Sequence, residues 1–127
     1  LPKRIREFAI LIAGREMQSP YEWYIHEPIA LRSGVTRETA DALAAQRRPP
    51  HMTHDEAITY QFVTELHKTH MVQDATYDAF KARFGESGVV ELTALDSYFG
   101  LLGQELNVAR TAAPENVQLP FNPPWKS

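Results

Sequence analysis

The chain has 127 residues, enough for one domain with a single core, and its 43% hydrophobic and 23% charged residues are typical of a globular protein. A formal net charge of −3 without a basic stripe argues against nucleic acid or an anionic membrane as a partner. The absence of cysteine excludes disulfides, thiolate nucleophiles and CxxC redox cycling, and together with the lack of any long apolar run it predicts a cytoplasmic protein.

A first helix is predicted over residues 1–17, because apolar side chains recur there at helical spacing and Pro2 suits a first turn. The chain enters this pattern almost directly from Leu1. We therefore expect that a further N-terminal segment precedes it.

The clearest helix start follows. Ser19 can cap a helix, Pro20 suits the first helical position, and Glu22 stands where a capping-box glutamate would. This second helix is expected to run to Ser33, with a kink at Pro28, and to end at the glycine that follows.

Four further helices are predicted from caps and stops. One spans residues 36–46, and a long one opens at the capping box Thr53–Glu56. The last two cover residues 74–84 and 86 to about 109, separated at Gly85.

No segment alternates as a strand, so residues 1–111 are predicted to form an all-α domain of about six helices. The composition then changes, since residues 112–127 hold four of the nine prolines. We expect this segment to be an extended arm. Its Phe121 and Trp125 predict docking on its own core or on a neighbouring subunit.

Three ionisable side chains form the first candidate site. Glu22 and His26 are four residues apart and therefore share a helix face, and an antiparallel hairpin can bring Glu7 alongside them. Apolar surroundings shift carboxyl and imidazole pKa values toward neutrality, which suits general acid–base catalysis. Structural alternatives stay open: Glu22 as a capping residue, His26 as an ordinary hydrogen-bonded histidine, and Glu7 as a solvated residue. Tyr24 lies within a turn of both Glu22 and His26 and is a candidate for contact with a substrate.

Two histidine pairs have spacing similar to that of metal ligands. They are His51 with His54 and His67 with His70. The capping Thr53 separates the members of the first pair, and no neighbouring cysteine or carboxylate completes either set. We therefore predict no metal site.

Residues 6–13 and 21–30, followed by Gly34-Val-Thr36, resemble the carboxymuconolactone decarboxylase family, which includes the alkylhydroperoxidase D-type thiol peroxidases. Residues 72–74 and 84–92 resemble a subgroup of that family. The resemblance implies an alkylhydroperoxidase D-like helical bundle with no metal or organic cofactor. It also implies a homo-oligomer, either a trimer or a hexamer, with a dimer as another possibility.

The resemblance also implies roles for particular residues. The two cysteines of the peroxidase branch would fall at Ser19 and Glu22, so this chain lacks that branch's thiol cycle. The branch's proton-relay glutamate would fall at Glu7, nineteen residues before His26. By this comparison His26 is the general acid/base, Glu22 shares or tunes that role, and Glu7 orients the imidazole.

The function implied is cofactor-free acid–base chemistry on a small carboxylated lactone or ring compound, as in 4-carboxymuconolactone decarboxylase. Arg15 or Arg32 would bind a substrate carboxylate. The chain lacks the tyrosine–glycine–proline stretch of authentic decarboxylases and differs from them over residues 91–107. A related lyase, isomerase or hydrolase therefore stays open, as does a non-catalytic binding or assembly protein.

Overall fold

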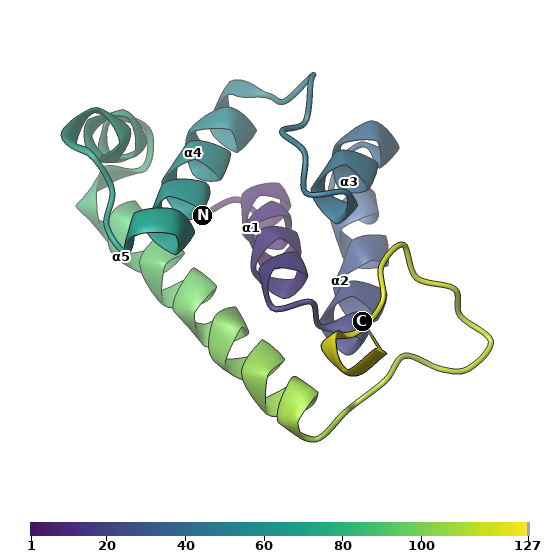
Figure 1. The fold of residues 1–127 in the computed structure, drawn as a ribbon. Helices are drawn as coiled ribbons and strands as arrows, with labels where there is room; N and C mark the ends of the chain where they lie inside the picture. The colour runs from purple at the N-terminus through teal and green to yellow at the C-terminus, as the bar shows by residue number, and fades with distance from the viewer. Residues whose placement is uncertain (127) are drawn as a thin grey trace.

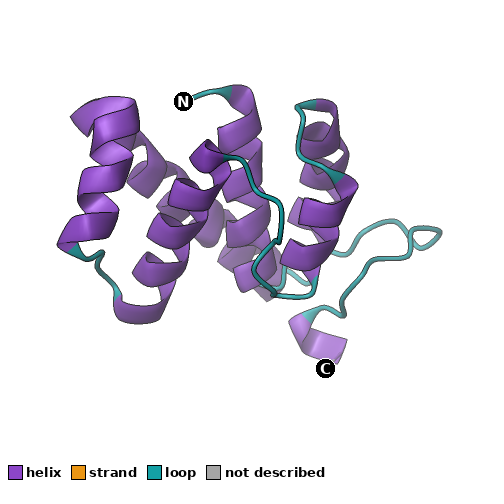
Figure 2. Ribbon diagram, turned by 90° about the horizontal axis from the view of Figure 1, so that it is seen from above, coloured by secondary structure: helices purple, strands orange, loops and turns teal. Residues whose placement is uncertain are grey.

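The computed structural model describes residues 1–126, which are helical with no strand (Figures 1 and 2). An all-α fold is therefore confirmed. No helix among these residues has the length and apolarity needed to cross a membrane. The elements are α1 (Lys3–Glu16), α2 (Pro20–Arg32), α3 (Arg37–Ala44), α4 (His54–Thr69), α5 (Asp74–Val108) and the short 3-10 helix η1 (Pro124–Lys126).

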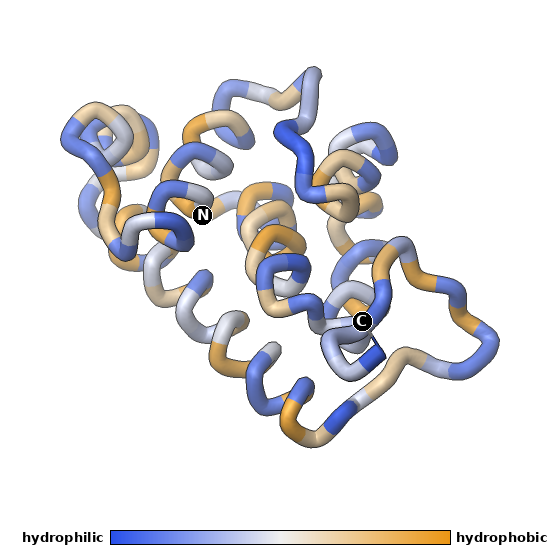
Figure 3. The backbone as a smooth tube through the Cα atoms, viewed as in Figure 1, coloured by the Kyte–Doolittle hydropathy of each residue, from blue (hydrophilic) through white to orange (hydrophobic). Residues whose placement is uncertain are grey.

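Helix α1 lies at the centre of the fold, between α2 and α3 on one side and α4 and α5 on the other (Figure 1). Nine of its 14 residues are buried, including every residue from 7 to 14. A helix that is apolar nearly all round must be surrounded by other elements, and the hydrophobic colouring of α1 in Figure 3 follows this rule. The core around it contains Phe8, Trp23, Phe62, Phe80 and Leu92.

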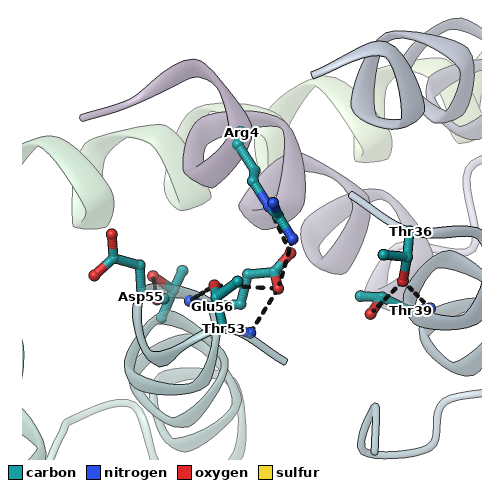
Figure 4. Close-up of polar contacts among 7 residues, drawn as sticks. Arg4, Thr36, Thr39, Thr53, Asp55 and Glu56 are labelled. Atoms are coloured by element: carbon teal, nitrogen blue, oxygen red, sulfur yellow. Dashed lines mark hydrogen bonds and ion pairs between the residues drawn. The ribbon is translucent and has the colours of Figure 1, made fainter. Parts of the chain in front are cut away.

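Side-chain caps start α3 and α4 where the sequence predicts them (Figure 4). Thr36 accepts a hydrogen bond from the backbone N–H of Thr39 at 3.1 Å. Thr53 and Glu56 form a reciprocal capping box. The Glu56 carboxylate also accepts two hydrogen bonds of 3.3 Å from Arg4, so the same residue that caps α4 ties it to α1.

The helix count differs from the prediction. The two helices expected over residues 74–84 and 86–109 form one element, α5, which is interrupted at a single residue. Gly85 has φ 74° and ψ 177°, and helical backbone resumes directly after it. The two parts of α5 run in different directions (Figure 1). The predicted stop is thus a one-residue break, and the described residues contain five α-helices where six were expected.

The segment after α5 loops out, returns to α2 and ends in η1 (Figure 1). The Asn122 carbonyl accepts a hydrogen bond of 2.6 Å from Gln18, and the Phe121 ring packs edge-on against Trp23 at 5.6 Å. The segment is therefore not a simple extended arm, because contacts with the helical core of the same chain hold its far end in place. Residue 127, the last of the predicted arm, lies outside the described residues.

Candidate functional site

Helices α1 and α2 bring Glu7 and His26 together. Glu7 Oε2 lies 2.8 Å from His26 Nδ1, and the two side chains are only 12% and 18% exposed. Burying a carboxylate requires a partner, and His26 supplies one. The edge of the His26 imidazole also meets the Phe99 ring on α5, with 5.2 Å between ring centroids. The imidazole is thus held by contacts with both α1 and α5.

This geometry defines the roles of the two imidazole nitrogens. When Nδ1–H donates to Glu7, the neutral ring carries a lone pair on Nε2, and the charged ring carries a proton there. No hydrogen bond to His26 Nε2 is formed within residues 1–126. His26 can therefore offer Nε2 as a base or, when charged, as an acid.

Glu22 is buried, at 4% exposure, and neither carboxylate oxygen has a hydrogen-bond partner among the described residues. Glu22 therefore forms no hydrogen bond with His26, although the two residues are one helical turn apart. Glu22 is not the reciprocal half of a capping box either. Ser19 Oγ accepts from the Glu22 backbone N–H at 3.4 Å, but the Ser19 N–H donates to the carbonyl of Gly14. Capping therefore does not explain why this carboxyl group is buried.

Two glycines of neighbouring helices lie close to the Glu22 side chain. A Cβ atom placed on Gly14 of α1 would lie 3.2 Å from Glu22 Oε2, and one on Gly103 of α5 would lie 3.3 Å away. The carboxyl group thus fills the space that two glycines leave between their helices. Burial raises the pKa of Glu22 to about 7, so near neutral pH it can hold or release a proton.

Three predicted substrate-contacting residues lie elsewhere. Residues two apart on a helix do not face each other, and Tyr24 packs near Tyr21, with 6.2 Å between their ring centroids, on a different face from His26. Arg32 is exposed at the end of α2, about 9 Å along the helix axis from His26. The third, Arg15, is about 12 Å along α1 from Glu7 and donates a hydrogen bond of 2.6 Å to the Ala44 carbonyl.

Sequence reasoning missed a second imidazole–carboxylate pair. His67 Nε2 lies 2.7 Å from Oδ1 of Asp96, a buried residue of α5. Twenty-nine residues separate the two positions, so no local pattern connects them. His51 pairs with Glu38 on the surface instead of with His54. Within residues 1–126 no three histidine, aspartate or glutamate side chains come together as a metal site.

No protein-family model, curated protein or solved structure matches the chain. The assignment of Glu7, Glu22 and His26 as a site therefore depends on their geometry. Membership of the carboxymuconolactone decarboxylase family is a proposal that depends on the residues quoted above.

Proposed function

We propose that the chain is a cofactor-free acid–base enzyme that acts on a small carboxylated lactone or ring compound, resembling 4-carboxymuconolactone decarboxylase. The observation that carries this proposal is the 2.8 Å contact between Glu7 Oε2 and His26 Nδ1. A carboxylate on Nδ1 fixes the tautomer and the orientation of the imidazole, leaving Nε2 for proton transfer. Glu22, one helical turn before His26 and with a pKa of about 7, supplies a second exchangeable proton.

In the proposed reaction the substrate carboxylate leaves as carbon dioxide. The electron pair of the broken carbon–carbon bond passes into the conjugated ring system as an enolate. His26 Nε2–H then donates its proton to the carbon that carries this charge, and Glu7 keeps the imidazole aligned during the transfer. Glu22 shares the proton-donor role. These steps use only side chains of this protein.

The test is turnover of small carboxylated lactones, measured as carbon dioxide release and loss of the lactone absorbance. His26→Ala is expected to lower kcat by about 10²–10⁴-fold because it removes the general acid. Glu7→Gln, which keeps the shape but not the charge, is expected to lower it by about 10-fold or more.

The matched controls are His51→Ala and Glu38→Gln. These two residues make the same 2.8 Å imidazole–carboxylate contact, but on the surface, where their side chains are 79% and 55% exposed. Both control variants should keep full turnover. Equal losses in the buried and the surface pair, or no loss at His26, would contradict the proposed site.

Helix α5 carries a row of exposed apolar residues, which are Val90, Tyr98, Leu101 and Val108. This row favours a second candidate, a non-catalytic binding or assembly protein of the same family without thiol peroxidase activity. Such a row suits contact with another subunit, and a trimer, hexamer or dimer is proposed with either function. If the protein is non-catalytic, sedimentation should show an oligomer. The His26→Ala substitution should then not change any turnover. A cytoplasmic location stays a prediction.

A further inference from the structure

A cavity of about 280 Å³ lies between α1, α4 and the region that joins α3 to α4. Its volume is close to the lower end of the range for small-molecule sites, about 300 Å³. None of Glu7, Glu22 and His26 lines it, so it is separate from the proposed catalytic site. The residues that define its character are Ile12, Leu43, Tyr60, Arg15, Arg47 and Lys68.

The cavity carries more positive than negative groups: Glu16 also lines it and acts on Arg15 through its charge, but it forms no ion pair with the arginines or the lysine. Arg15, Arg47 and Lys68 form no ion pair with a carboxylate in residues 1–126. Arg15 is held in place, since its Nε donates to the Ala44 carbonyl at 2.6 Å and its guanidinium lies 4.4 Å from the centre of the Phe121 ring. A fixed guanidinium with unpaired N–H groups is suited to a planar carboxylate, which it can bind through two parallel hydrogen bonds.

His67 forms another wall of the cavity. Its Nε2 contacts Asp96, while its Nδ1 lies 4.0 Å from Glu16 Oε2. Burial by itself lowers the pKa of His67, but the hydrogen bond to Asp96 and the charges of Asp96 and Glu16 together raise it above the ordinary value. His67 also lines a second cavity, of about 340 Å³.

We propose that the cavity between α1 and α4 binds a small organic carboxylate, with its charged group at Arg15 and its apolar body against Ile12 and Leu43. We choose this class of ligand because the cavity is lined by both apolar and cationic residues. An inorganic anion would leave the apolar wall without a partner, whereas a neutral ring would leave the cations unpaired. The inference is independent of the proposed catalytic function.

The site also predicts how affinity depends on pH. The charged groups around His67 are Arg15 and Glu16 from α1, Lys68 from α4 itself, Asp96 from α5, and Arg47 from the segment after α3. The pKa of His67 is raised by its hydrogen bond to Asp96 and by the charges of Asp96 and Glu16, so a falling pH adds positive charge at this wall of the cavity. Binding of the anion should then become tighter.

The experiment is an NMR titration of the full chain with benzoate at pH 6, followed through backbone amides and the His67 imidazole. Saturable shifts are expected at residues that line the cavity, with benzamide and inorganic phosphate each binding about tenfold more weakly. His26→Ala should leave the saturable shifts at the cavity residues unchanged. Equal binding of benzamide, tighter binding of phosphate, absence of saturable shifts, or shifts centred on His26 would each overturn the proposal.

Variants that remove a charge at the cavity edge should change the affinity for benzoate in opposite directions, depending on the sign of the charge removed. Arg47→Gln with Lys68→Gln is expected to weaken benzoate binding by about tenfold, while Glu16→Gln should tighten it by roughly two- to threefold. These residues are exposed or lie at the cavity edge, so their replacement leaves the core packing intact. Lys3→Gln, an exposed charge at the far end of α1, is the control and should leave the affinity unchanged. Parallel effects of Lys3→Gln and Lys68→Gln would contradict a specific site.

Discussion

A carboxyl group without a hydrogen-bond partner is costly to bury, and Glu22 buries both of its oxygens in this way. Its pKa of about 7 records that cost, because burial opposes the charged form. An unfolded glutamate has a pKa of about 4.3. Between these two values the folded chain holds a proton that the unfolded chain has lost, so folding stability falls as pH rises from about 4.3 to about 7.

Replacing Glu22 with glutamine removes this titration. Glu22→Gln should raise the free energy of unfolding at pH 8 by about 1–3 kcal/mol, because the amide is neutral whereas the carboxylate must be buried as a charge. At pH 4 it should have little effect, because the carboxyl group is then neutral in the folded state and mostly neutral in the unfolded state. Thermal unfolding at the two pH values measures the difference.

The control is Glu105→Gln, which replaces an exposed glutamate of α5. It should leave the pH dependence unchanged. If Glu22→Gln destabilises the protein at pH 8, Glu22 has a stabilising partner that its surroundings do not reveal. In the proposed function the same variant lowers turnover, so this residue would trade stability for activity.

At the scale of elements, single residues decide where helices change direction. Gly85 adopts φ 74° and ψ 177°, a conformation that is essentially restricted to glycine. Nothing lies within 4 Å of a Cβ placed there, so steric contact with neighbours is not what excludes a side chain. The constraint on this position therefore comes from its backbone conformation alone, so a single substitution measures its energy.

Gly85→Ala should therefore destabilise the protein by about 1–3 kcal/mol. Gly100 provides a control with the opposite sign. It lies inside the helical part of α5, and a Cβ there also has open space. Gly100→Ala should stabilise the protein by about 0.5–1 kcal/mol, because alanine is the better helix former. Urea unfolding of both variants measures the two changes in the free energy of unfolding. If both changes have the same sign, the backbone conformation of Gly85 is not what limits this position.

The features predicted correctly from sequence are those with local causes. The caps at Thr36 and Thr53 and the break at Gly85 each depend on a few neighbouring residues. The contact between His67 and Asp96 depends on how α4 packs against α5, which no short pattern encodes. An antiparallel hairpin of the first two helices, together with the family resemblance, predicts Glu7 beside His26, whereas no signal in the sequence predicts the direction of the Arg15 side chain.

At the scale of the whole molecule, the C-terminal segment closes the fold around α2. Phe121 lies edge-on against Trp23, which is 1% exposed, and also beneath the Arg15 guanidinium. One aromatic ring of the segment thus covers a core tryptophan and positions a cation of the proposed anion site. The predicted boundary at residues 111 and 112 separates two parts of the chain that depend on each other in packing.

Phe121→Ala tests this coupling. Trp125 is the second tryptophan, so the measurement uses Trp125→Phe as background and reports on Trp23 alone. Loss of the ring should shift Trp23 emission to longer wavelength and lower the free energy of unfolding by about 1–2 kcal/mol, since Phe121 is only half-buried. Val117→Ala, a half-buried change elsewhere in the segment, should leave the emission unchanged. An unshifted Trp23 spectrum in Phe121→Ala would contradict the packing role.

The two glycines beside Glu22 have a consequence for how this sequence can evolve. A Cβ on Gly103 would lie 2.7 Å from the Met17 Cβ and 3.3 Å from Glu22 Oε2, and one on Gly14 would meet the same carboxylate. The three positions share one volume, so each limits the size permitted at the others. In a lineage that retains the carboxylate, a side chain at Gly14 requires Glu22 to move by a few tenths of an ångström, whereas one at Gly103 must also displace Met17. A lineage that replaces Glu22 with a small residue gains room beside both glycines, but Gly103 stays limited by Met17.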